Sequence, residues 1–431
     1  MSELFLSPWI PEFVLVLLAG TARALRGSWL SPAALVALIW AFYIAGCLLL
    51  TDYQIFPGGI WIIVLFVFSV QFGATLAEGA VKIHQSQTEA RRLDLETVEL
   101  WSRRSFLFTV LFAAVALIGM IHLLLYSFEK YSLGFSLLSL LSLGHLWSVA
   151  RYQNGELEPW SVRLLIMWVY PAALLAGICF ATARRRLHKY ASFMPLLPAT
   201  LIGSVFAERA GLAFAVVCWL SGFFAVRYYE TRGAYALFQR KLVIVMLSLV
   251  AGGLLFFVTI DTLRIFEGGD NVELRLDTPR ISKYLFGSVP AFCSWFHYMH
   301  PEEPGWGALT FSGVFDLLGI KQREIGVYVD HVTLMGGEET NIYTMFRGLI
   351  EDFTLTGMCC FGILLGVVSG YASRLRQLGA ILTLSGCYAL LLFSPLISLF
   401  AYNGLILAWV VSALLLGWRR RPRTFEAEAL A

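Results

Sequence analysis

The sequence predicts an all-α polytopic membrane protein with about eleven transmembrane helices and one large loop. Of its 431 residues, 58% are hydrophobic and only 14% are charged, and the mean hydropathy is +0.72. A soluble domain of this length needs a larger charged surface, so the excess apolar surface must face lipid. The apolar residues also gather into runs of roughly 20, which is the length that a helix needs to cross a bilayer.

These runs divide the chain into three parts. Residues 1–260 contain eight spans and an apolar helical connection at 128–162, on the side that carries few basic residues. Residues 261–352 form the large loop, and residues 353–431 contain three spans and a basic tail. The predicted spans lie near residues 10–25, 33–50, 55–76, 106–126, 164–183, 193–206, 210–226, 242–260, 353–371, 380–397 and 399–417.

Basic residues cluster after every second span, and the positive-inside rule assigns this side to the cytoplasm. The clusters include Arg23 with Arg26, the run from Arg184 to Arg186, and the arginines of the C-terminal tail. Outside the large loop, the opposite side receives only Lys130, Arg151, Arg163 and Arg209. We therefore predict that the N-terminus lies outside and the C-terminus lies in the cytoplasm.

Arg209 follows the short, Pro-containing sixth span and directly precedes the seventh. An arginine between two apolar segments is costly unless it reaches water or a partner. Two interpretations stay open, an ion pair with Glu208 or a phosphate ligand at the start of a helix. In the large loop, Arg280 and Arg347 lie beside apolar runs, which favours them as anion ligands over the other loop cations.

Candidate general bases lie shortly before the ninth span, at His331, Glu338 and Glu339. A carboxylate or imidazole that is buried near the outer interface has its pKa moved toward neutrality, as a base requires. The competing interpretation is that each is an ordinary polar loop residue. The His-containing string at 297–303 predicts no metal site, because Pro301 ends any helix there.

Aromatic residues cluster in the large loop, at Trp295, Phe296, Tyr298 and Trp306. Such side chains stack on sugar rings, and they also anchor proteins at the membrane surface. No P-loop, no dinucleotide-binding glycine motif and no GxSxG elbow occurs, so we predict neither nucleotide chemistry nor a nucleic-acid partner.

Glycines recur every four residues in the ninth span, at Gly362, Gly366 and Gly370. This spacing places them on one face of a helix, where small residues let two backbones approach closely. The pattern therefore predicts that another helix packs tightly against this face.

Four strings between residues 200 and 371 resemble the O-antigen polymerase (Wzy) family. The string ETNIYTMFRGLIEDFTLTGMCCFGILLG is similar to the segment that enters a late transmembrane helix of that family. The opening of the family's large periplasmic loop is similar to KYLFGSVPAF, and the Thr-Phe segment of that loop is similar to GALTFSGVFDLLG. The string ERAG lies where family members carry Gly-Ser-Arg before a helix. The matching positions of the first string are Thr340, Asn341, Tyr343, Thr344, Asp352, Phe353 and Gly357.

The resemblance implies a GT-C-like fold of the O-antigen polymerase–ligase type in the bacterial inner membrane, with a periplasmic N-terminus. It implies a transferase of undecaprenyl-pyrophosphate-linked oligosaccharides that moves the growing chain onto the non-reducing end of an incoming repeat. Membrane lipid and a chain-length regulator are the further partners that it implies. We expect no cofactor and no metal, because arginines can neutralise a pyrophosphate leaving group.

This chemistry requires cations on the pyrophosphate, a base for the attacking hydroxyl and a groove for sugars. We predict Arg209 and Arg280 as pyrophosphate ligands, supported by Arg347 and Arg151, and Glu339 before His331 as the base. The predicted sugar contacts are Asn341, Tyr343, Trp295 and Tyr284.

Two departures from the related patterns keep alternatives open. O-antigen ligases carry a His-Asn pair where this chain has Thr340 and Asn341, which argues against a ligase. Neither Arg280 nor Arg347 is followed by Gly at the offset described for some polymerases. A transporter, such as a flippase for lipid-linked oligosaccharides, is the rival function, because the short sixth span resembles a discontinuous transporter helix.

Overall fold

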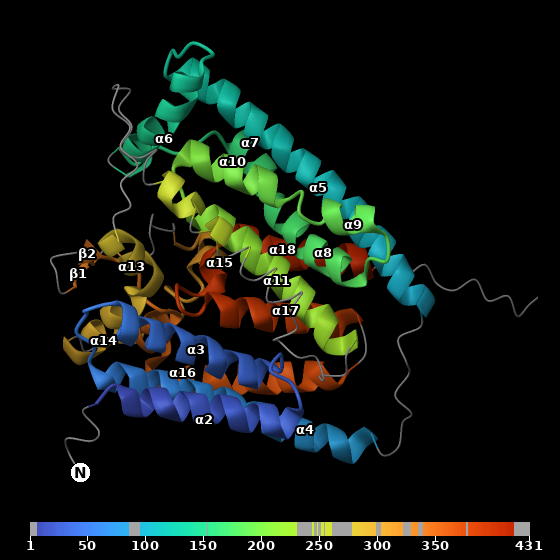
Figure 1. Cartoon of the computed structure of the whole chain (residues 1–431), viewed down its shortest axis with the longest axis vertical. Coiled ribbons are helices and arrows are strands. Elements are labelled where there is room, and N and C mark those ends of the chain that lie inside the picture. Colours follow the sequence, from blue (N-terminus) through green and yellow to red (C-terminus); the bar gives the residue numbers. More distant parts are fainter. Residues whose placement is uncertain are drawn as a thin grey trace, which may run out of the picture.

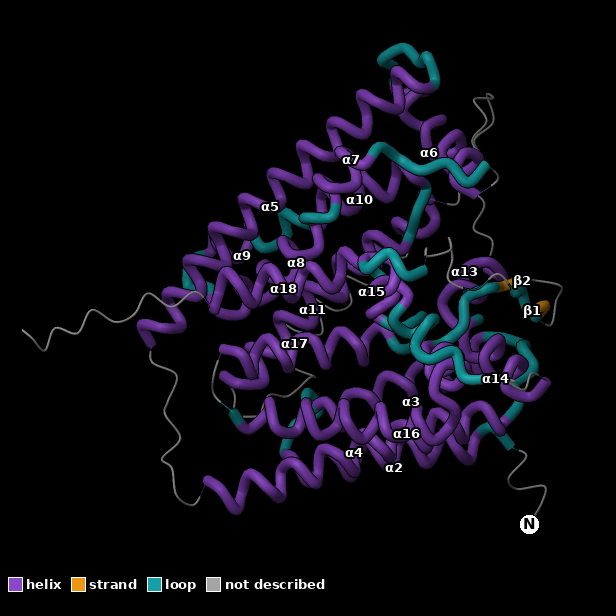
Figure 2. Tube along the Cα trace, turned by 180° about the vertical axis from the view of Figure 1, so that it is seen from behind, coloured by secondary structure: helices purple, strands orange, loops and turns teal. Residues whose placement is uncertain are grey.

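The apolar runs fold into a bundle of long helices with a smaller folded region at one end (Figure 1). Figure 2 shows the same bundle from behind, with a short β-hairpin at this end. The structure is a computed structural model. It describes residues 7–85, 95–152, 154–230, 244, 248, 251–253, 255–260, 278–298, 303–321, 328, 330–334, 339–375 and 378–417.

The described helices follow the hydrophobic pattern closely. In the first half they are α2 (Trp9–Arg26), α3 (Pro32–Leu50), α4 (Pro57–Gln85), α5 (Leu95–Lys130), α6 (Leu137–Tyr152), α7 (Trp160–Ile166), α8 (Val169–Thr182), α9 (Arg186–Ala191), α10 (Leu196–Phe206) and α11 (Ala210–Glu230). In the second half they are α13 (Thr278–Phe286), α14 (Ser288–Tyr298), α15 (Ser312–Leu317), α16 (Met345–Arg374), α17 (Leu378–Phe393), the 3-10 turn η1 (Leu399–Ala401) and α18 (Asn403–Gly417).

Within the described residues, six helical segments are long and apolar enough to cross a membrane. They are Pro32–Leu50, Pro57–Gly79, Trp101–Lys130, Trp160–Thr182, Ala210–Tyr229 and Met345–Arg374. The prediction of an all-α membrane protein is therefore confirmed, and six of the predicted spans fall in these segments.

The other predicted spans are less complete. The helices α10, α17 and α18 are apolar but have 11, 16 and 15 residues. The helix α2 contains Glu12, Arg23 and Arg26, and most of 242–250 lies outside the described residues. The total of eleven spans stays a prediction.

The helices α4 and α16 pack with their backbones in contact. A Cβ atom on Gly73 would come within 2.1 Å of the carbonyl oxygen of Ile363, and one on Gly366 within 2.1 Å of that of Val70. Each helix thus presents a glycine to the backbone of the other, which is the arrangement that close packing in membranes requires. The packing face predicted from the glycine spacing is confirmed.

The helices α8 and α11 repeat this arrangement in the other half of the bundle. A Cβ atom on Gly177 would come within 1.9 Å of the carbonyl oxygen of Trp219, and one on Gly222 within 2.5 Å of that of Leu174. Two glycine-lined helix pairs therefore form the centres of the two halves.

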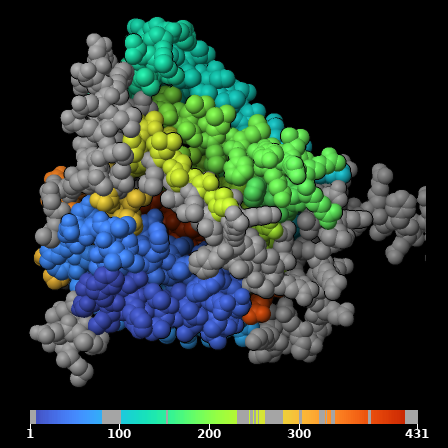
Figure 3. Space-filling view, viewed as in Figure 1, coloured from blue at the N-terminus to red at the C-terminus, as the bar shows by residue number. Residues whose placement is uncertain are grey.

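The folded region at one end, here called the cap, comprises the described residues between 278 and 353, which include the first turns of α16. Its helices α13 and α14 pack on α3 and α4, while α15 packs on η1 and α18. Asn403 of α18 donates a hydrogen bond of 2.9 Å to the Asp316 carboxylate of α15. The cap therefore joins both halves of the bundle, and Figure 3 shows its gold residues at their junction.

The cap also contains the two strands. β1 (Val332–Thr333) and β2 (Glu339–Thr340) pair antiparallel, with Val332 opposite Thr340. In the described part of the chain, this hairpin is the only β-structure.

The connection predicted at 128–162 contains α6, which packs against α10. Leu143 and Trp147 of α6 are buried with Phe206 of α10, whereas Leu137 and Leu138 are largely exposed. The helix therefore packs on the protein with one face and leaves apolar side chains on the other.

The end of the bundle opposite the cap is held by ion pairs. The Glu78 carboxylate of α4 forms an ion pair with Arg26 of α2 at 2.7 Å and with Arg374 of α16 at 3.5 Å. Because α16 begins in the cap at Met345 and ends at Arg374, this residue lies at the opposite end of the bundle from the cap.

Adding a methyl group at Gly366 should separate α4 from α16. We expect Gly366→Ala to lower the free energy of unfolding by about 1–3 kcal/mol, because the new carbon meets a backbone oxygen that cannot move aside. Thermal unfolding of the detergent-solubilised protein measures this loss. Gly379→Ala is the control, because a Cβ atom there meets nothing within 4 Å. Equal melting temperatures for the two variants would contradict the packing.

Candidate functional site

The first turns of α16 belong to the cap, because the helix breaks at Thr354. This residue has φ 63° and ψ 179°, which lies outside the helical region and is strained for any residue except glycine. The break releases two carbonyl groups, and they accept hydrogen bonds from the loop. Gly305 donates to the carbonyl of Glu351 at 2.9 Å, and Trp306 donates to that of Asp352 at 3.2 Å.

The Asp352 carboxylate strengthens the same attachment. It is fully buried and accepts backbone N–H groups from Thr310 at 2.6 Å and from Leu309 at 3.2 Å. A Cβ atom on Gly305 would lie 2.6 Å from this carboxylate, so any larger residue would have to displace it from its N–H donors. A buried carboxylate needs such donors to offset its lost hydration. Asp352 is one of the motif residues identified in the sequence, and in the structure its carboxylate links the loop to the helix.

Arg347 is buried in the middle of the cap half of α16. Its guanidinium donates to Glu351 and to Asp330, each at 2.9 Å. Its central carbon lies 4.2 Å from the ring centroid of Tyr343, 4.3 Å from that of Tyr328 and 5.5 Å from that of Trp295. We call these six residues the Arg347 cluster: Arg347, Glu351, Asp330, Tyr343, Tyr328 and Trp295.

Three of the predicted site residues, Arg347, Tyr343 and Trp295, thus come together in this cluster. Burial raises the pKa of both Tyr343 and Tyr328, so the two phenols stay protonated. The single cation of the cluster has two carboxylate partners, Asp330 and Glu351. Its aromatic rings face Arg347 and are themselves buried.

The two predicted bases lie at the rim of the Arg347 cluster. His331 follows Asp330 directly and precedes β1, while Glu339 begins β2, and both side chains are exposed. The burial that the base hypothesis requires is therefore not present at either residue. Asn341 donates a hydrogen bond of 3.3 Å to the carbonyl of Tyr328, which holds the end of the hairpin to the cluster.

Arg209 occupies a second position at the same end of the bundle. Its guanidinium carbon lies 3.9 Å from the ring centroid of Phe257 and 4.0 Å from that of Tyr284, and the two rings meet edge to face, with their centroids 5.1 Å apart. Lys283 lies 5.4 Å from the Tyr284 ring. Such cation–π contacts hold a guanidinium in place.

Arg151 of α6 forms an ion pair with Glu208, the residue that the sequence offers as a partner for Arg209. It donates to the Glu208 carboxylate at 2.7 Å, and its guanidinium also lies 4.7 Å from the Phe206 ring centroid. The Glu208 ion pair is therefore made by Arg151, from α6, and not by the residue next to it in sequence.

The hairpin of α13 and α14 contacts both arginines. Its first helix carries Tyr284 to Arg209, and its second carries Trp295 to Arg347. The backbone of Arg280 lies in α13, but its side chain is outside the described residues. The predicted residues thus form two groups, connected by eleven residues of one helical hairpin.

The two groups differ in charge. The group at Arg209 contains the cations Arg209, Lys283 and Arg151 with the carboxylate Glu208. The Arg347 cluster has one cation and two carboxylates, and Asp352 adds a third nearby. Among the described residues, cations therefore predominate in the first group and carboxylates in the second.

Within the residues that the structure describes, no three His, Cys, Asp or Glu side chains lie close enough to hold a metal ion. Comparison of the chain with protein-family models, with curated proteins and with solved structures gives no match.

Removing the buried cation should destabilise the cap. We expect Arg347→Met to lower the free energy of unfolding by about 3 kcal/mol or more, since Glu351 is left without its partner. Asp330→Asn should cost only about 1 kcal/mol or less, because that carboxylate is 65% exposed. Thermal unfolding of both variants in detergent gives the comparison. An unchanged stability for Arg347→Met would show that the cluster does not hold the cap.

Proposed function

We propose that this protein polymerises oligosaccharide repeat units carried on undecaprenyl pyrophosphate, at the outer face of the bacterial inner membrane. The observation that carries the proposal is the α13–α14 hairpin, which contacts a cationic group through Tyr284 and a carboxylate-rich cluster through Trp295. A glycosyl transfer from a lipid pyrophosphate needs both kinds of group close to one bound substrate.

The distribution of charge supports the orientation. Arg26 and Arg374 lie at the end opposite the cap, and the run from Arg184 to Arg186 lies at a helix connection on that side (Figure 1). The positive-inside rule places this end in the cytoplasm. The cap is then periplasmic, as are the N-terminus and the substrate, while the C-terminus is cytoplasmic.

In the proposed reaction, the hydroxyl oxygen at the non-reducing end of the incoming repeat attacks the anomeric carbon of the growing chain. The bond between that carbon and the pyrophosphate oxygen breaks, and undecaprenyl pyrophosphate leaves with the bonding electron pair. The hydroxyl proton passes to a base, for which Glu339 and His331 are the candidates at the rim of the cap. Arg209 stabilises the charge on the leaving pyrophosphate, with Lys283 and Arg151 beside it.

We assign the sugar contacts to aromatic side chains that are exposed to solvent. Trp295 and Tyr343 are 3% and 1% exposed, and both face Arg347. In the same cap, Tyr298 and Trp306 are 67% and 80% exposed. Because sugar rings stack on exposed aromatic faces, we assign the platform to Tyr298 and Trp306, with Trp295 and Tyr343 in a supporting role.

Removal of the stacked arginine tests the proposal. We expect Arg209→Ala to lower chain elongation by roughly 10²-fold, as loss of one charge-stabilising group does in other transferases. The lipopolysaccharide of a complemented deletion strain should then carry a single repeat in place of a ladder. Arg209→Lys should restore part of the ladder, and Arg163→Ala, which removes a 47% exposed cation, should leave it unchanged.

The lipopolysaccharide banding pattern also distinguishes the rival functions, provided that the variants reach the membrane at wild-type levels. A normal ladder from Arg209→Ala would contradict the proposed role. Repeats that accumulate on the cytoplasmic leaflet of the deletion strain would indicate a flippase. Full-length polymer that stays on the lipid carrier would indicate a ligase.

A further inference from the structure

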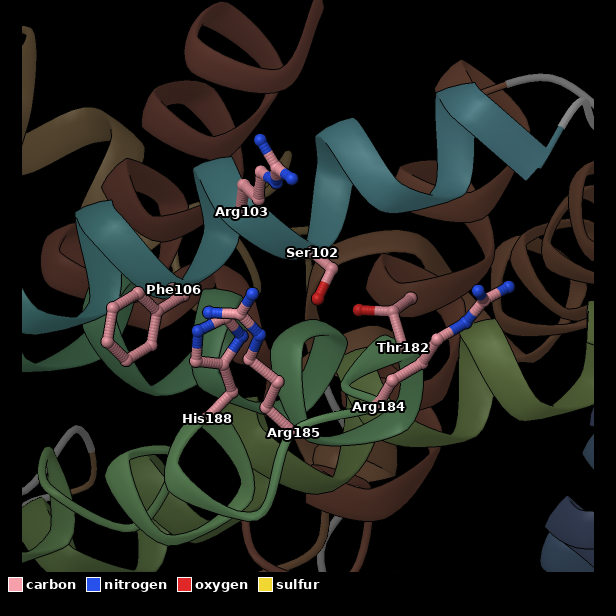
Figure 4. A pocket seen from close by; sticks show the side chains of 7 residues that line it. All are labelled: Ser102, Arg103, Phe106, Thr182, Arg184, Arg185 and His188. Carbon is pink, nitrogen blue, oxygen red and sulfur yellow. The ribbon is translucent and has the colours of Figure 1, made fainter.

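A pocket of about 440 Å³ opens at the end of the bundle opposite the cap, away from both groups described above. It lies between the start of α5 and the connection from α8 to α9 (Figure 4). Its lining residues are Ser102, Arg103, Phe106, Thr182, Arg184, Arg185 and His188.

The pocket is rich in cations. Arg103 comes from α5, while Arg184 and Arg185 come from the connection that follows α8. None of the described lining residues is acidic. Within the described part of the chain, neither Arg184 nor Arg185 forms an ion pair, and both side chains are exposed. Two adjacent arginines without carboxylate partners attract an anion strongly.

The floor of the pocket is polar and ordered. The hydroxyls of Ser102 and Thr182 point toward one another across it, from α5 and α8 (Figure 4). Thr182 donates its hydroxyl proton to the carbonyl of Ile178 at 2.9 Å, which leaves the Ser102 hydroxyl as the donor at the floor. His188 stacks on Phe106 with ring centroids 4.1 Å apart, which fixes one wall.

The position of the pocket relates it to the bilayer. One wall of the pocket is formed by the first residues of the candidate membrane span Trp101–Lys130. The other wall includes Thr182, the last residue of the span Trp160–Thr182. A site where two spans end lies at the depth of lipid headgroups. Apolar side chains continue from it along the same elements, with Leu107 61%, Leu187 69% and Tyr190 72% exposed.

We propose that this pocket binds the phosphate of an anionic phospholipid. Arg184, Arg185 and the Ser102 hydroxyl hold the headgroup, and the acyl chains lie along the exposed apolar residues of α5 and α9. Basic pockets between helix ends are the sites at which membrane proteins recognise anionic lipids. The inference rests on the charge and depth of this pocket, and it holds whatever reaction the opposite end catalyses.

Native mass spectrometry of the full-length protein in neutral detergent tests the proposal with two probes, phosphatidylglycerol and phosphatidylcholine. We expect phosphatidylglycerol to be retained preferentially. The double variant Arg184→Gln/Arg185→Gln should weaken this binding roughly thirty-fold, because each arginine near the headgroups contributes about 1 kcal/mol. Arg163→Ala, at the other end of the bundle, should bind as the wild type does.

Three results would overturn the proposal: equal retention of the two lipids, an unchanged affinity in the double variant, or displacement of the lipid by millimolar inorganic phosphate. The last would show that the site takes soluble phosphate. Should the double variant fail to fold, Ser102→Ala provides the second test. It keeps every charge and should weaken phosphatidylglycerol binding severalfold, and unchanged binding would contradict the assigned headgroup contact.

Discussion

Thr354 interrupts α16 and separates a half-helix that belongs to the cap from a longer half that packs on α4. A threonine with φ 63° and ψ 179° costs about 1–3 kcal/mol. The freed carbonyls of Glu351 and Asp352, together with the Asp352 carboxylate, offset this cost by binding backbone N–H groups between 305 and 310. The break at Thr354 therefore frees the carbonyls through which the loop is hydrogen-bonded to the helix.

The rest of the cap depends on this half-helix. Phe346 packs against Trp40 and Phe66 of the bundle, with ring centroids 5.0 Å away in each case, and anchors the helix start. The next residue, Arg347, binds Asp330 and contacts three aromatic rings. The rigid part of the cap is thus built around one buried cation and one buried carboxylate, five residues apart. Arg347 serves this framework, which leaves Arg209 as the better placed arginine for a pyrophosphate.

Much of the bundle could be predicted from the sequence, because lipid imposes simple requirements on length and apolarity. The glycine spacing predicts the α4–α16 contact, since only small residues allow that approach. The internal order of the cap could not be predicted in this way. Asp352 finds its donors about forty residues away, and a sequence pattern carries no signal for such partners.

The candidate site shows the same division. Sequence motifs select Arg347, Tyr343 and Trp295, and the structure brings them together. They do not reveal that Arg347 is already neutralised, or that Glu208 pairs with Arg151 from another helix. They also favour burial for His331 and Glu339, whereas both are exposed on the hairpin. Partners and exposure are tertiary properties, so hydropathy and motif spacing leave them open.

The central claim is that the α13–α14 hairpin joins a pyrophosphate site to an acid–base site and thereby extends a glycan on its lipid carrier. The most direct measurement uses the purified protein in liposomes, supplied only with a repeat unit on undecaprenyl pyrophosphate. The account predicts products that lengthen by whole repeats, with one undecaprenyl pyrophosphate released for each new bond. Repeats that stay single, whether or not they cross the bilayer, would contradict it.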